Sequence, residues 1–201
     1  MPEVRGSSGW LLGLQILAPW LSVLLFWFWL RHAWAAMLGY HAQILYWRRR
    51  ELLVAFRRRP ARSHLAALPL LGSGLLLVWL LPGWAQMPLG DWMAAHQLSP
   101  QGFLWMIPWF GLLHPRLEQL HWRPLCAATP WAHAAFAGYH ALVLASLLPP
   151  WLLTLCTLGL ALVSRIWQQF PEEFAVRTHQ AADTGIALGA LWLLQNSSSF
   201  L

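Results

Sequence analysis

The stretch WLLGLQILAPWLSVLLFWFWL, residues 10–30, contains no charged side chain. An α-helix needs about 20 consecutive apolar residues to cross the hydrocarbon core of a bilayer, and this stretch has that length. Residues 1–8 carry a single Arg, Arg5, and no small-residue cleavage site follows the apolar run. We therefore predict that residues 10–30 form an uncleaved membrane-spanning helix rather than a signal peptide.

The composition of the whole chain agrees with this prediction. Of the 201 residues, 58% are hydrophobic, 10% are charged and 16 are Trp. Soluble domains carry about a quarter charged residues, and disordered chains lack such apolar content. The two cysteines are too few for a disulfide framework or a four-thiolate zinc site. We predict an all-α fold: a polytopic integral membrane helical bundle with five or six transmembrane helices, forming a single domain over residues 1–201.

The positive charges are concentrated in one part of the chain. All 13 basic residues are Arg, and eight of them lie in residues 31–62, where the only acid is Glu51. Positively charged loops remain in the cytoplasm, so residues 48–64 are predicted to be cytoplasmic. There they would attract anionic lipid headgroups rather than nucleic acid. Residues 1–64 thus form an N-terminal span with a basic cytoplasmic segment, and residues 65–201 form the core bundle with the candidate site.

Further apolar stretches predict the remaining spans, which are residues 65–84, 134–148, 151–167 and about 184–194. Residues 33–47 are also apolar but short. They could cross as a hairpin partner of the first span. Alternatively, the first helix continues past the membrane and residues 33–60 lie along the interface, and both remain open because no Gly or Pro marks a turn at residues 31–33.

Two segments that contain most of the remaining polar residues, 85–131 and 164–183, separate these spans. Residues 103–113 are apolar but too short to cross unaided, so we predict an interfacial or re-entrant helix there. Counting crossings from the basic segment then puts residues 85–131 and 164–183 together on the non-cytoplasmic side. We expect an integral protein of a bacterial inner (cytoplasmic) membrane whose candidate site faces that side.

Two of the polar motifs in these segments have side chains that could bind an anion. Arg116 and Arg123 are seven residues apart, so two helical turns place their guanidinium groups on one face, as a fork for phosphate. The alternative is a pair of arginines that anchor an interfacial helix. His133 follows Pro130 at the start of a span, where a helix N-terminus favours anions. Alternatively, His133 is held by a backbone carbonyl.

The third motif joins the end of one span to the start of the next. Ser164-Arg165 ends a span, and His179-x3-Asp183 precedes the last one. His and Asp four residues apart on a helix lie side by side. The carboxylate can hold one imidazole nitrogen and leave the other free to attack or to accept a proton.

In chain order, the motifs are Arg-x6-Arg-Pro, Pro-x2-His, Ser-Arg and His-x3-Asp. This order resembles the type 2 phosphatidic acid phosphatase (PAP2) superfamily, whose pattern is Lys-x6-Arg-Pro, Pro-Ser-Gly-His and Ser-Arg-x5-His-x3-Asp. The resemblance covers about residues 114–194. The chain departs from the pattern at Trp131 and Ala132, which replace Ser and Gly, and in the 13 residues between Arg165 and His179.

The resemblance implies a membrane phosphatase or phosphotransferase that acts on a lipid phosphate or pyrophosphate through a phosphohistidine. His179 would be the nucleophile, Asp183 would orient it, and His133 would protonate the leaving group. The phosphate would be bound by Arg116, Arg123 and Arg165. No metal or other cofactor is implied. The expected partners are the lipid phosphate substrate and membrane lipids, without nucleic acid; protein partners are unknown.

A second enzyme class matches other residues. Glu172-Glu173-x3-Arg177 fits the Glu-Glu-x3-Arg motif of intramembrane CAAX-type proteases, and Phe136-x3-His140 fits their second motif. In that family, however, the Glu-Glu motif comes first and further spans carry the later ligands.

Two alternatives without hydrolytic activity complete the hypotheses. A haem b-binding membrane subunit needs two His at matching depth on facing helices, and His41 could pair with His140, which shares a helix face with His133. A non-catalytic integral membrane subunit or scaffold of a larger complex would use the 16 Trp only for interfacial belts and core packing.

Overall fold

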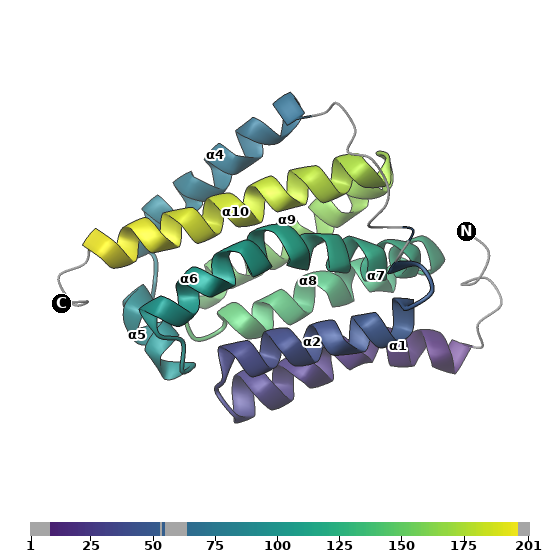
Figure 1. Ribbon diagram of the computed structural model, residues 1–201, viewed down its shortest axis with the longest axis horizontal. Helices are drawn as coiled ribbons and strands as arrows, with labels where there is room; N and C mark the ends of the chain where they lie inside the picture. Colours follow the sequence, from purple (N-terminus) through teal and green to yellow (C-terminus); the bar gives the residue numbers. More distant parts are fainter. Residues whose placement is uncertain (1–8, 53, 55–63, 197–201) are drawn as a thin grey trace.

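The computed structural model describes residues 9–52, 54 and 64–196, and all regular secondary structure within them is helical (Figure 1). The predicted all-α class is therefore confirmed. Four of the eight arginines of residues 31–62 lie outside the described residues, namely Arg57, Arg58, Arg59 and Arg62. The elements in chain order are α1 (Gly9–Ser22), the π-helix η2 (Val23–Trp29), α2 (Ala33–Arg48), α4 (His64–Leu80), the 3-10 helix η3 (Leu81–Gly83), α5 (Leu89–Ala95), α6 (Pro100–Pro108), the π-helix η4 (Trp109–Leu113), α7 (His114–Ala128), α8 (Trp131–Leu144), α9 (Pro150–Gln168) and α10 (Glu172–Asn196).

The first two helices form an antiparallel hairpin. The chain reverses at Arg31, which adopts a positive φ of 48°. His32 then caps α2, because its Nδ1 accepts a hydrogen bond from the backbone N–H of Ala35 at 3.2 Å. α2 packs back along α1 and η2 (Figure 1). Of the two alternatives for residues 33–47, the structure therefore has the hairpin.

Residues 100–128 form one long helical run, so residues 103–113 are part of a longer element. Ser99 caps the run by accepting the N–H of Gly102 at 3.0 Å, and Pro100 occupies its first turn. η4 widens the run between Pro108 and Pro115, where the α-helical hydrogen-bond ladder lacks two donors. This π-helical segment lets the chain continue from α6 into α7. The interfacial or re-entrant position of residues 103–113 stays a prediction.

The long run also changes which segments share an end of the bundle. Arg48, at the end of α2, donates to the backbone carbonyl of His121 at 3.3 Å and to Oε1 of Gln15 at 3.0 Å. Figure 1 accordingly shows the end of α2 and the end of α7 at the same side. The ends of α2 and α7 thus share one end of the bundle, whereas the sequence placed residues 85–131 together opposite the basic segment. The sides of the membrane on which these segments lie stay a prediction.

Glycines bring α4 and α10 into close contact. A Cβ atom on Gly185 would overlap the backbone carbonyl of Leu71, and one on Gly74 would overlap the backbone of α10 at Ala182. The two backbones approach this closely only because neither glycine has a side chain. This contact fixes α10, which carries two residues of the candidate site.

Among the described residues, two helical stretches, Gly9–Trp29 and Pro150–Gln168, are long and apolar enough to cross a membrane, and Ala67–Gly83 is a shorter apolar helix. Large apolar side chains remain exposed along all three, among them Leu17, Leu76 and Leu158. Exposed apolar area of this extent is unusual for a protein surrounded by water.

Candidate functional site

The carboxyl group of Glu118 lies at the centre of the bundle, on α7, and its residue is 0% exposed. The hydroxyl of Tyr40, on α2, donates to its Oε1 at 2.8 Å. Nε2 of His114, one helical turn earlier on α7, lies 3.3 Å from the same oxygen. A carboxyl group this deep in an apolar bundle requires such partners, because burial without them is costly.

Two further helices bring imidazoles to Glu118. Nε2 of His140, on α8, lies 4.0 Å from Oε1, and Nε2 of His179, on α10, lies 3.4 Å from Oε2. Asp183 follows His179 by one helical turn and places Oδ2 at 3.5 Å from the same Nε2. A single imidazole nitrogen therefore lies between two carboxyl groups.

The ring of His179 is fixed on its other sides. Its Nδ1 lies 3.3 Å from the amide nitrogen of Gln119, and its face stacks on Trp167 with ring centroids 4.6 Å apart. When Gln119 donates to Nδ1, the neutral imidazole carries its proton on Nε2, between the two carboxyl groups.

A second set of side chains surrounds this centre. The Glu118 cluster, as we name it, consists of Tyr40, His41, His114, Glu118, Tyr139, His140, His179 and Asp183. His41 Nε2 lies 2.9 Å from His114 Nδ1, and the Tyr139 hydroxyl lies 3.2 Å from that of Tyr40. The cluster thus joins α2, α7, α8 and α10 through polar side chains in the core.

One fully buried oxygen of the cluster lacks a hydrogen bond. Oε2 of Glu118 is buried and has no hydrogen-bond partner, although the imidazole of His179 is nearby. Buried polar atoms are almost always bonded, and exceptions gather at functional sites. Within the described parts of the chain, no three His, Cys, Asp or Glu side chains are arranged to hold a metal ion.

The predicted phosphate-site residues divide into two groups. His179 and Asp183 are adjacent, as the spacing predicted. Arg116 instead pairs with Glu173 at 3.7 Å, and Arg123 donates to the backbone carbonyls of Trp167 and Phe170. These two guanidinium groups thus contact protein acceptors.

The remaining two predicted residues lie near each other at the ends of α8 and α9. His133 Nδ1 forms a hydrogen bond with the Ser164 hydroxyl, next to Arg165, which is exposed. The roles assigned to these residues in phosphate transfer stay predictions. The Glu172-Glu173 pair of the protease alternative lies at the start of α10, where Glu173 faces Arg116.

Sequence reasoning missed Glu118, Gln119, His114 and Tyr40. A signal for the first two was present, because Glu118-Gln119-x3-Arg123 precedes Phe136-x3-His140 in the chain. This is the order in which CAAX-type proteases carry Glu-Glu-x3-Arg and Phe-x3-His, with Gln in place of the second Glu. The structure brings Glu118 and His140 within 4.0 Å.

The chain matches no protein-family model, and no curated protein or solved structure is detectably similar to it. The resemblances to PAP2 phosphatases and to CAAX-type proteases therefore depend on the motif residues alone.

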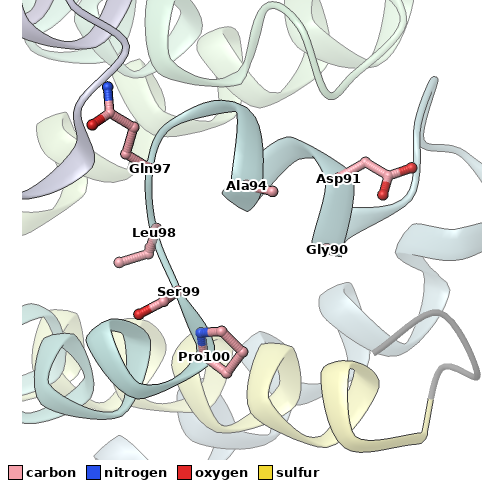
Figure 2. A pocket seen from close by; sticks show the side chains of 7 residues that line it. All are labelled: Gly90, Asp91, Ala94, Gln97, Leu98, Ser99 and Pro100. Carbon is pink, nitrogen blue, oxygen red and sulfur yellow. The ribbon is translucent and has the colours of Figure 1, made fainter. Parts of the chain in front are cut away.

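A surface hollow of about 550 Å³ lies away from the cluster, at the loop between α5 and α6 (Figure 2). It is lined by Gly90, Asp91, Ala94, Gln97, Leu98, Ser99 and Pro100. Next to this loop, burial lowers the pKa of His96, whose ring stacks on Trp27 at 3.9 Å. The lining contains one carboxylate and no histidine, so the hollow lacks the acid–base groups of the Glu118 cluster.

Proposed function

We propose that the protein is a membrane-embedded peptidase in which Glu118 activates a water molecule. The observation that carries this proposal is the meeting of His140 and His179 at the fully buried carboxyl group of Glu118, within 4.0 and 3.4 Å. An acid with imidazoles in an apolar enclosure suits general acid–base catalysis, since a carboxyl group and an imidazole can each accept and donate a proton.

The hydrogen bonds of His140 support a water molecule at this position. Its Nδ1 lies 2.8 Å from the carbonyl of Phe136, which can only accept, so the neutral ring has its lone pair on Nε2. Nε2 of His140 and Oε1 of Glu118 are then two acceptors 4.0 Å apart. Two acceptors cannot bond each other, whereas a water that donates to both would satisfy them.

The peptidase reaction follows from this arrangement. Glu118 accepts a proton from the water, whose oxygen forms a bond to the carbonyl carbon of the peptide. The bond from that carbon to the amide nitrogen then breaks. His179, between Glu118 and Asp183, passes the proton to the leaving amine and keeps its orientation through Asp183.

The motif order supports peptide bonds as the substrate. Glu118-Gln119-x3-Arg123 and Phe136-x3-His140 follow the pattern of intramembrane CAAX-type proteases. His179 and Asp183, on the later helix α10, take the place of that family's later ligands. The Gln at position 119 is the departure from the pattern.

Embedding in a membrane is part of the proposal. Exposed Trp side chains lie near both ends of the bundle: Trp131 (80% exposed) and Trp10 at one end, Trp29 (83%) and Trp151 at the other. Trp gathers at the two interfaces of a bilayer. We propose a polytopic bundle with the five or six spans predicted from the sequence and the additional run of residues 100–128, with the basic segment in the cytoplasm of a bacterial cell.

One observation favours a second candidate, the phosphohistidine phosphatase implied by the PAP2 resemblance. His179 and Asp183 are 3.5 Å apart, the arrangement that a carboxylate-oriented nucleophile needs. Against it, Glu118 adds a second carboxyl group beside His179 that would repel a phosphate.

The test is a pair of assays on detergent-solubilised protein. A library of apolar peptides is incubated with the protein and searched for fragments by mass spectrometry, and phosphate release is measured from lipid phosphates and pyrophosphates. Glu118→Gln should abolish peptide cleavage, while the matched control Glu173→Gln, outside the cluster, should retain it. Phosphate release without peptide cleavage would overturn the peptidase in favour of the second candidate.

A further inference from the structure

Two chains of polar contacts begin at tryptophan indoles and lead to the same oxygen of Glu118. In the first, Nε1 of Trp109 donates to Nδ1 of His41 at 2.7 Å. An indole N–H can only donate, so it fixes the direction of the chain from its first member.

This first donor also determines which ring nitrogen carries the proton in each of the next two imidazoles. Because Nδ1 of His41 accepts, the proton of the neutral ring is on Nε2, which lies 2.9 Å from Nδ1 of His114. His114 accepts there in turn, so its own proton is on Nε2, 3.3 Å from Oε1 of Glu118. In this chain, each member carries its N–H on the side that faces the carboxyl group.

The second chain is shorter. Nε1 of Trp122 donates to the Tyr40 hydroxyl at 2.8 Å, and Tyr40 donates to Oε1 of Glu118 at 2.8 Å. Oε1 therefore accepts a hydrogen bond from Tyr40 and has Nε2 of His114 at 3.3 Å, whereas Oε2 has no hydrogen-bond partner. The two oxygens of this carboxyl group therefore differ in their hydrogen bonding.

We propose that Trp109, His41 and His114 form a positioning relay that, together with Tyr40, holds the carboxyl group of Glu118 in place and in its ionised form, so that it can accept the proton of the water. This inference rests on the peptidase proposal and goes beyond it, because it assigns a function to residues that do not touch the substrate. Hydrogen bonds from donors stabilise the ionised form of a carboxyl group, and they do so strongly where water is excluded.

The relay predicts a pH dependence whose sign follows from the donors. The groups that face Glu118 are His114 on its own helix, Tyr40 on α2, Tyr139 and His140 on α8, and His179 and Asp183 on α10. Loss of the His114 donor makes protonation of Glu118 easier. The base is active when ionised, so activity should disappear at a higher pH on the acid side.

The experiment compares two substitutions at one position. His114→Leu removes the relay, whereas His114→Gln keeps an amide nitrogen near the position of Nε2 that can donate to Glu118. We expect His114→Leu to lower kcat by about tenfold or more at unchanged KM and to move the acid limb of the pH profile up by about one unit. His114→Gln should restore most of both. If His114→Leu does not fold, Trp109→Phe provides the same comparison with a smaller loss.

A spectroscopic measurement tests the direction of the chain without activity. In protein labelled with ¹⁵N at His and Trp, the ring nitrogens of His41 and His114 should report protonated Nε2 and unprotonated Nδ1, and Trp109→Phe should move the His41 signals. The opposite tautomers, or a His114→Leu enzyme with the pH profile of the wild type, would overturn the relay while leaving the peptidase proposal intact. If the wild type cleaves no peptide, the peptidase fails and the positioning role fails with it, whereas the tautomers still report the hydrogen-bond direction.

Discussion

Oε2 of Glu118 and Nε2 of His179 lie 3.4 Å apart, and Oδ2 of Asp183 lies 3.5 Å from the same nitrogen. The imidazole has one N–H to share between two carboxyl groups. Full ionisation of both acids around one neutral ring would be unfavourable in a buried site, because like charges repel strongly there. The protonation states of the three groups therefore depend on one another.

The first prediction separates the two candidate functions by their histidines. His140 belongs to the Glu118 cluster, whereas His133 bonds Ser164. If peptide hydrolysis is the activity, His140→Ala should lower it by roughly 10²-fold or more, since a positioned acid–base group contributes about that much. His133→Ala, the matched control, should change it by less than about threefold. Phosphate transfer through His179 requires the reverse order of the two losses, which rates from the same two assays would reveal.

The second prediction concerns the contact between α4 and α10. A Cβ on Gly185 overlaps the backbone carbonyl of Leu71, so Gly185→Ala should force the helices apart and cost about 1–3 kcal/mol of unfolding free energy. Gly72, on α4, has nothing within 4 Å of its position for a Cβ. Gly72→Ala should therefore leave the stability unchanged or raise it by up to about 1 kcal/mol. Thermal unfolding in detergent measures both, and equal midpoints for the two variants would contradict the close contact.

The third prediction concerns Arg48, which is buried between α1 and α7. Its guanidinium group donates to Gln15 and to the carbonyl of His121. Arg48→Met would leave both acceptors without this donor, so we expect a loss of about 1–3 kcal/mol in denaturant or thermal unfolding. Arg49 is exposed and lies over the ring of Tyr46, so Arg49→Met should cost less than about 1 kcal/mol. A larger loss for Arg49→Met than for Arg48→Met would argue against the buried position of Arg48.

Local patterns in the sequence predicted local relationships well. The spacing of His179 and Asp183 was sufficient to place them together, because four residues make one helical turn. The hairpin at Arg31 gave no such signal, since a positive φ is usual for Gly and this position holds an Arg. The passage through η4 was equally hidden, because Pro108 and Pro115 normally indicate helix ends.

The partners of Glu118, at the centre of the site, could not be predicted from local sequence patterns for a different reason. In the sequence, Glu118 stands between Arg116 and Arg123 and looks like a counter-charge for them. Its actual partners include Tyr40 and His179, from opposite ends of the chain, and no periodicity encodes such pairing. Only the order of the two protease-like motifs pointed to Glu118, and the second Glu of that pattern is absent.

The last prediction tests how the bundle lies in the membrane. With Cys126 and Cys156 replaced by Ser, single cysteines are introduced at the exposed positions Arg49, Ala94 and Ala128. Arg49 follows α2 and Ala128 ends α7, at the same end of the bundle, whereas Ala94 belongs to α5 at the other end (Figure 1). In intact cells, an impermeant thiol reagent should therefore label Ala94→Cys only, since the basic segment stays in the cytoplasm. The crossing count from the sequence places Ala94 and Ala128 on the same side, so labelling of both without Arg49→Cys would restore that topology and refute a membrane pass through residues 100–128.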